Sequence, residues 1–254
     1  MLKNFSKTKV DTKSNYKMQQ NDYSTEFILI DCINKCNDES LEHPQNALVV
    51  SDINLPGKKN ANSLCGSVDG VLSDAECETI IKRAEGMGFM SAMMNGGEGE
   101  IFRPEVQKSG RCIIDDVDFA NVIFNRIKNC LPSVIINGWG LECDLVGLNE
   151  RMHVLRYDNG EYFAPHQDGS YSKNSNTRSF LTVVVYLNSG GGLDFEGGTS
   201  NFVSPYETEN SVTKFVPKRG GVLAFDHSLL HEGAAVVRGT KYCIRTDVMY
   251  TQRN

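Results

Sequence analysis

The residues of this chain best suited to chemistry are the triplet His166-Gln167-Asp168 and, far downstream, His231. Two imidazoles and one carboxylate are the ligands of mononuclear non-haem Fe(II) sites, where one face of the metal stays open for a co-substrate and O2. Lys241 follows His231 by ten residues and could supply a cation for the far carboxylate of 2-oxoglutarate. The spacing therefore suggests an iron centre that uses 2-oxoglutarate and O2.

The His-x-Asp triplet alone is weak evidence, because a simple hydrogen-bonded pair is its default interpretation. On a strand, however, residues i and i+2 project to the same face, so that His166 and Asp168 could grip one ion. His227 competes with His231 as the third ligand. We favour His231, because only this histidine stands ten residues before a lysine that opens a strand. A zinc hydrolase would use the same ligand types but leaves Lys241 unexplained.

The segment that begins at Lys241 alternates like a strand with two different faces. Lys241, Cys243, Arg245 and Asp247 fall on one face, and Tyr242, Ile244, Thr246 and Val248 fall on the other. This pattern suits a barrel with a polar pocket inside. A buried cation needs an anionic partner, so either Lys241 or Arg245 could pair with a dicarboxylate while the other pairs with Asp247. Two exposed charges on an edge strand are the alternative interpretation.

Length and composition restrict the class of protein. The 254 residues suffice for a sizeable core, and 40% hydrophobic with 23% charged residues is ordinary for a globular domain. A net charge of −6 offers no broad basic field, so we expect no nucleic-acid partner. The eight cysteines show neither a paired framework nor a zinc pattern, which favours reduced thiols in a reducing compartment.

The N-terminal region differs in character from the rest of the chain. The first ten residues, MLKNFSKTKV, lack the apolar core of a signal peptide, and no stretch has the apolar length of a membrane span. We therefore expect an intracellular location, cytoplasmic or nuclear, and no membrane partner. Residues 1–62 are predicted to form a partly disordered extension, and residues 63–254 the folded domain.

Two helices are predicted ahead of a run of strands. One starts at a capping box, Ser73 with Glu76, and continues to about residue 86; the other spans about 117–131. The glycine-rich segment 93–100 between them is predicted to be a surface loop, with a mobile lid as the alternative. Short strands follow from Met152 onward. The order of elements predicts an α+β fold with a double-sheet jelly roll.

From about residue 64 to its C-terminus, the chain resembles the Fe(II)/2-oxoglutarate-dependent dioxygenases, specifically the prolyl 4-hydroxylase-like branch. The segments that match are residues 155–168, 186–188, 197–199 with Phe202, and 231–242, of which 239–242 close the last segment. The resemblance implies a double-stranded β-helix (jelly-roll) core with supporting N-terminal helices. It also implies Fe(II), 2-oxoglutarate and O2 as cofactors, with ascorbate as reductant.

The same resemblance implies roles for individual residues. His166, Asp168 and His231 would bind the metal, Lys241 would hold the 5-carboxylate of 2-oxoglutarate, Tyr157 and Tyr186 would contact the co-substrate, and Thr182 would line the same strand. Arg245, four residues beyond the lysine, leaves the identity of the carboxylate partner open. Because halogenating relatives need a small residue at the position of Asp168, its carboxylate favours hydroxylation.

The expected activity is hydroxylation of a C–H bond on a protein or peptide side chain, prolyl groups included, with release of succinate and CO2. An oxidative demethylase of nucleic acid is a second possibility, which the net negative charge of the protein disfavours. A non-catalytic sensor that binds metal and 2-oxoglutarate is a third, which the complete ligand set disfavours. Substrate identity, the role of residues 1–62 and the oligomeric state stay open.

Overall fold

The computed structural model describes residues 49–57, 60, 63–97, 99–204 and 212–253. Most of the extension predicted for residues 1–62 lies outside these residues. Its end, β1 (Val49–Asp52), pairs along its whole length with β2 (Cys65–Asp69) and so joins the main sheet. The domain boundary near residue 62 stays a prediction. Six described cysteines are free thiols, while Cys32 and Cys36 lie outside the described residues.

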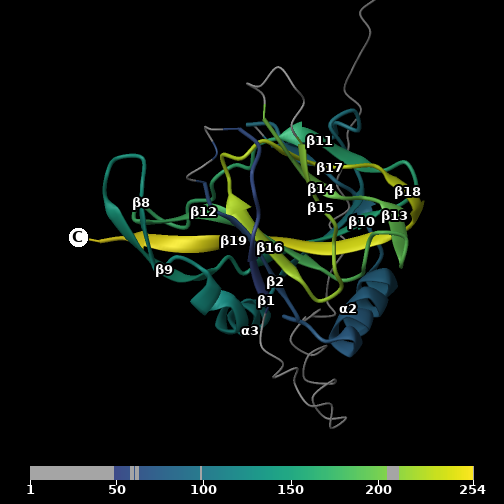
Figure 1. The fold of residues 1–254 in the computed structure, drawn as a ribbon, viewed down its shortest axis with the longest axis horizontal. Coiled ribbons are helices and arrows are strands. Elements are labelled where there is room, and N and C mark those ends of the chain that lie inside the picture. The colour runs from purple at the N-terminus through teal and green to yellow at the C-terminus, as the bar shows by residue number, and fades with distance from the viewer. Residues whose placement is uncertain (1–48, 58–59, 61–62, 98, 205–211, 254) are drawn as a thin grey trace, which may run out of the picture.

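An antiparallel sheet of ten strands forms one layer of the fold (Figure 1). After β1 and β2, its order continues with β16 (Val222–Asp226), β12 (Thr177–Tyr186), β19 (Lys241–Gln252), β10 (Arg151–Tyr157), β7 (Gly110–Asp115) and β3 (Met90–Ser91). Two further strands extend the sheet beside the C-terminal half of β19: β9 (Glu142–Leu148), and β8 (Val134–Ile136) beyond it.

A second antiparallel sheet of five strands forms the other layer. Its order is β15 (Val212–Phe215), β14 (Ser200–Val203), β17 (His231–Gly233), β11 (Tyr162–His166) and β6 (Gln107–Lys108). One two-stranded ribbon joins β13 (Phe195–Gly197) to β18 (Val236–Gly239). Because the chain passes repeatedly between the two sheets, the strands form a jelly roll. The jelly-roll prediction is confirmed.

The two predicted helices are present ahead of most of the strands. Helix α2 (Asp74–Met87) starts at the capping box of Ser73 and Glu76, and α3 (Val117–Ile127) is capped by Asp116. The second helix ends earlier than predicted, because its last turn is a 3-10 helix, η2 (Lys128–Cys130), before the proline at 132. Both helices lie on the same side of the ten-stranded sheet (Figure 1).

The two faces of β19 belong to two different hydrophobic clusters. Ile244 and Val248 pack in the cluster that includes the buried residues of α2 and α3. Cys243 packs instead with Tyr157 and Tyr186 in a second cluster, between the sheets. The alternation predicted for this strand is therefore confirmed: the apolar face is covered by helices, and the charged face points to the inside of the jelly roll.

The glycine-rich segment is a small hairpin on the surface. Its strands β4 (Met94–Asn95) and β5 (Glu100–Ile101) pair with each other. Arg111 of β7 ties the hairpin down, because its guanidinium donates to both carboxylate oxygens of Glu100, at 2.9 and 3.0 Å, and to the carbonyl of Met93. No helix in the described part of the chain is long and apolar enough to cross a membrane.

Candidate metal and co-substrate site

Pairing of β11 with β17 places His166 directly opposite His231. Their ring centroids lie 4.3 Å apart. Asp168 follows the end of β11, and its carboxylate oxygens lie 3.7 Å from Nε2 of His166 and 3.8 Å from Nε2 of His231. Ligand atoms of the three residues all lie within 4.8 Å of one another, so one ion can contact all three. The structure thus brings the predicted triad together.

Backbone carbonyls orient both imidazoles. Nδ1 of His166 lies 2.8 Å from the carbonyl oxygen of Ala164, and Nδ1 of His231 lies 2.9 Å from that of Leu229. Since a carbonyl can only accept, each Nδ1 carries the proton and each Nε2 keeps its lone pair. These lone pairs are available on the side where Asp168 lies, as metal-binding histidines require.

The protonation states of the triad also suit a divalent cation. Burial and the neighbouring His231 lower the pKa of His166 to about 4, and burial lowers the pKa of His231. Burial alone would raise the pKa of Asp168, but Arg245, His231 and the hydrogen bond from Thr182 bring it down to about 2. At neutral pH the site therefore offers two neutral nitrogens and one carboxylate, a donor set that fits Fe(II).

Lys241 is a buried cation that has no acidic partner among the described residues. Only 5% of the residue is exposed, and its Nζ donates to the carbonyl of Gly198 at 2.8 Å. The ammonium lies 5.5 Å from the ring centroids of both Tyr157 and Tyr186. Burial lowers its pKa, and no carboxylate of the described chain forms an ion pair with it. A bound dicarboxylate would supply the missing counter-charge.

The two tyrosines are buried, and their hydroxyl groups are un-ionised at neutral pH. Burial raises the pKa of both. The hydroxyl of Tyr186 lies 2.7 Å from Oγ of Ser200, and that of Tyr157 is hydrogen-bonded to Gln107 and Ser109. The sequence analysis missed these three partners. The sequence around Gln107 does not indicate a site residue, because Gln107 reaches the site only through the pairing of β6 with β11.

One cavity joins the triad to the buried lysine. It is lined by Leu155, Tyr157, Phe163, His166, Asp168, Thr182, Val184, Ser200, Phe225, His231, Glu232, Gly233, Lys241, Cys243 and Arg245. Every predicted site residue except Tyr186 lines this cavity. The cavity has mostly apolar walls, the triad, and a cation with no ion pair in the described chain, and this chemistry suits a small dicarboxylate.

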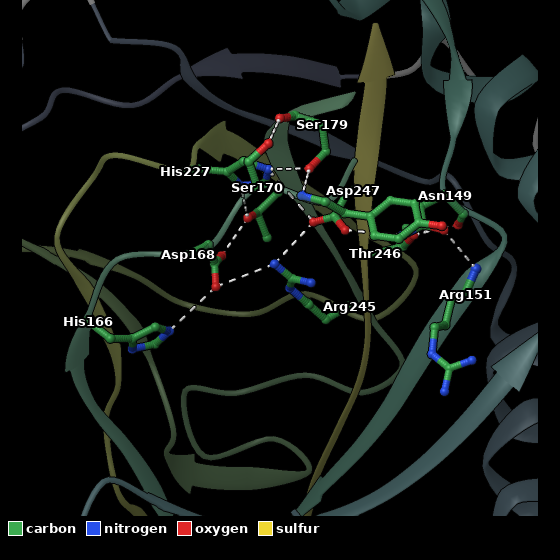
Figure 2. A network of polar contacts seen from close by, with 12 residues as sticks. Asn149, Arg151, His166, Asp168, Ser170, Ser179, His227, Arg245, Thr246 and Asp247 are labelled. Atoms are coloured by element: carbon green, nitrogen blue, oxygen red, sulfur yellow. Dashed lines mark hydrogen bonds and ion pairs between the residues drawn. The ribbon is translucent and has the colours of Figure 1, made fainter. Parts of the chain in front are cut away.

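Arg245 differs from Lys241 in its partners. Its Nη2 lies 3.0 Å from Oδ1 of Asp247 and 3.4 Å from Oδ1 of Asp168 (Figure 2). Thr182, which was predicted among the co-substrate residues, lines the cavity and donates to Oδ2 of Asp168. His227, the rival third ligand, lies outside the triad and contacts Thr182 at 2.9 Å.

Comparison with known proteins agrees with this geometry. Residues 152–246 match the sequence model of the 2OG-Fe(II) oxygenase superfamily. A curated relative, probable prolyl 4-hydroxylase 7 of Arabidopsis thaliana, is 26% identical over 194 residues, which are 68% of this chain. The match spans 58% of that relative's length.

The chain is also similar to solved structures. A prolyl-4-hydroxylase from Pseudomonas putida superposes with a TM-score of 0.50 at 14% identity, over 77% of this chain and 96% of that one. A prolyl hydroxylase from Trichoplax adhaerens, solved in complex with a hypoxia inducible factor oxygen degradation domain peptide fragment, has a TM-score of 0.49 at 17% identity, over 93% and 94% of the two chains. The first of these likenesses supports the jelly-roll fold.

Proposed function

We propose that this chain is a 2-oxoglutarate-dependent dioxygenase that hydroxylates a C–H bond on a protein or peptide side chain, since residues 152–246 match the sequence model of the 2OG-Fe(II) oxygenase superfamily. Fe(II), 2-oxoglutarate and O2 are its cofactors. The observation that carries the proposal is that one cavity contains the His166, Asp168 and His231 triad together with Lys241, which forms no ion pair within the described part of the chain.

The triad would hold the metal by two imidazole nitrogens and one carboxylate oxygen. Bound Fe(II) with 2-oxoglutarate and O2 supplies the oxidising power for C–H hydroxylation, and succinate and CO2 are released. Burial keeps the two imidazoles neutral by lowering their pKa values, although their bonds to the carbonyls of Ala164 and Leu229 act in the opposite direction; what those bonds do is fix the proton on Nδ1. These bonds leave both Nε2 atoms ready to bind.

Lys241 is the better partner for the 5-carboxylate of 2-oxoglutarate. Arg245 already contacts two carboxylates, those of Asp168 and Asp247, whereas among the described residues Lys241 donates to a neutral carbonyl only. Ser200 lines the same cavity as this lysine, and its hydroxyl, held by that of Tyr186, can add a hydrogen bond. The apolar walls limit the water that competes for these groups.

A peptide substrate is supported by the name of the curated relative, probable prolyl 4-hydroxylase 7. Proline is therefore the first side chain to test. Ascorbate as a reductant, an intracellular location and residues 63–254 as the folded unit belong to the same proposal.

The test is succinate formation from 2-oxoglutarate by the purified protein with Fe(II), ascorbate and O2. We expect slow turnover without a substrate, its loss in His231→Ala, and faster turnover with a proline-containing peptide that gains one oxygen in mass. Metal and 2-oxoglutarate binding without succinate, with every peptide tried, would favour the non-catalytic sensor. Succinate formation that survives His231→Ala would contradict the assigned site.

A further inference from the structure

A chain of hydrogen bonds ends on the carboxylate of Asp168 and runs behind it into the main sheet (Figure 2). It begins at the amide of Tyr171, which donates to Oγ of Ser179 at 2.8 Å. Oγ of Ser179 lies 2.9 Å from Nε2 of His227, and Nδ1 of His227 lies 2.9 Å from Oγ1 of Thr182. Thr182 then donates to Oδ2 of Asp168.

The groups at the two ends of this series of hydrogen bonds fix which atom donates in each bond. The amide of Tyr171 can only donate, and the carboxylate of Asp168 can only accept. Thr182 uses its one proton on Asp168, so it must accept a proton from Nδ1 of His227. Nε2 of His227 then accepts the proton of Ser179. A neutral imidazole satisfies every group, in keeping with the burial that lowers the pKa of His227.

The position of Asp168 explains why its side chain needs such support. His166 and His231 are held by the paired strands β11 and β17, but Asp168 lies beyond the end of β11. Its amide donates to the carbonyl of His227 at 3.0 Å, which fixes the backbone but not the carboxylate. Thr182 is 1% exposed and comes from the central strand β12, so it is a rigid support for the carboxylate.

A competing partner lies close to the same carboxylate. Nη2 of Arg245 is 3.4 Å from Oδ1 of Asp168. Without the bond from Thr182 to Oδ2, both oxygens could turn toward the planar guanidinium and form a paired contact, because arginine prefers two parallel bonds to one carboxylate. That rotation would take the carboxylate away from the two histidines.

We propose that His227 is a positioning residue of the metal site: through Thr182 it holds the Asp168 carboxylate in the orientation that binds metal. His227 therefore does not contact the ion, although it was the rival candidate ligand. The inference rests on the proposed function, since the orientation matters only if the triad binds a metal.

The experiment measures the dissociation constant of Co(II) alone for the full chain, by equilibrium dialysis without 2-oxoglutarate. Loss of a group that orients a metal ligand costs about 10- to 100-fold in affinity. We expect a loss of that size for His227→Leu. We expect near-normal affinity for His227→Asn, whose amide nitrogen replaces Nδ1, and a clear loss for His227→Gln, whose amide nitrogen replaces Nε2 instead.

A double variant tests whether His227 acts through Thr182. Thr182→Val removes the hydroxyl at constant size and should weaken Co(II) binding. The combination of Thr182→Val with His227→Leu should then bind no more weakly than Thr182→Val alone, because the two changes break one chain. Additive losses would overturn the proposal, and so would Co(II) binding by His227→Gln that equals that of His227→Asn.

Two controls separate the possible failures. Thermal unfolding of each metal-free variant identifies a change that only disturbs folding, and the Asn and Gln pair, both polar, decides the case if His227→Leu does not fold. His231→Ala tests the underlying site. If His231→Ala loses Co(II) but His227→Leu and His227→Gln keep it, only the positioning role is wrong. If His231→Ala keeps Co(II), the proposed metal site itself fails.

Discussion

His166 and His231 are register partners across β11 and β17, and their ring centroids lie 4.3 Å apart. The sheet therefore sets their separation before any ligand arrives. Each ring is also bonded through Nδ1 to a backbone carbonyl two residues away. A pre-formed pair of this kind binds a metal without first ordering its ligands, and binding should then stabilise the whole domain.

Metal addition should raise the thermal stability of the protein. A ligand that binds only the folded state at 100 times its dissociation constant adds about 2.7 kcal/mol to the free energy of unfolding. Calorimetric unfolding with Co(II), and again after a chelator, measures this gain. In His231→Ala the metal should leave the unfolding temperature unchanged; an equal gain in that variant would place the ion elsewhere.

Lys241→Ala should raise the KM for 2-oxoglutarate far more than Arg245→Ala. A hydrogen bond to a charged group contributes about 1.5–3 kcal/mol, which corresponds to roughly 10- to 150-fold in affinity. Lys241 has no other anionic partner in the described chain, whereas Arg245 is held by Asp168 and Asp247. Steady-state kinetics at varied 2-oxoglutarate, with Lys241→Arg as the charge-conserving control, measures the ranking. The reverse order would assign the carboxylate to Arg245.

Asp247→Asn should destabilise the protein strongly. Oδ1 of Asp247 is buried, lies 3.0 Å from Nη2 of Arg245, and accepts no hydrogen bond of good geometry from the described residues. Its role is thus to balance the charge of the guanidinium. Removal of one member of a buried ion pair costs about 3–5 kcal/mol when the other charge is left unpaired, and here Arg245 would keep only its longer contact to Asp168, at 3.4 Å.

A double variant distinguishes the contribution of charge balance at Asp247 from that of packing. Replacing both members of the pair, in Arg245→Met with Asp247→Asn, should cost less stability than Asp247→Asn alone. Urea unfolding of the single and double variants gives both free energies. A double variant that is less stable than either single one would mean that the two side chains contribute by packing.

Glu76 should make stability depend on pH. Burial disfavours its ionised form, but the hydrogen bonds from Arg126 and the backbone of Ser73 outweigh burial and keep the pKa of Glu76 below its ordinary value. A carboxyl with a lowered folded-state pKa stabilises the protein above its unfolded-state pKa, about 4.3, and this stabilisation is lost as the pH falls through the folded-state value.

Unfolding of wild type and Glu76→Gln at several pH values tests this linkage. At pH 7 the variant should be less stable, since the charged bond to Arg126 is gone. The difference should shrink steadily below about pH 4.3. A difference that stays constant over that range would show that the carboxylate charge contributes nothing. Glu78→Gln, on the exposed side of the same helix, serves as the matched control.

Local features of the sequence predicted the local elements of the structure. The capping box of Ser73 and Glu76 marks the start of α2, because a helix start depends on side chains within one turn. The alternation after Lys241 correctly assigned the two faces of β19, because successive side chains of any strand point in opposite directions. His166 and Asp168 lie close together for the same local reason.

Only the tertiary structure decided which distant residues meet these groups. His231 rather than His227 joins the triad because β17 pairs with β11, and His227 instead reaches Thr182 of β12. Spacing to Lys241 favoured the same histidine but could not show the contact that His227 makes.

The two cations of the last strand illustrate the same limit. The alternation of the last strand alone does not distinguish Lys241 from Arg245, since both lie on its inner face. Their partners come from other strands: the carbonyl of Gly198 for the lysine, and the carboxylate of Asp168 for the arginine. The sequence by itself determined the residue types and faces available for chemistry. Closure of the two sheets decided which cation meets a carboxylate among the described residues, because a charge can be paired only by groups that the fold brings within reach.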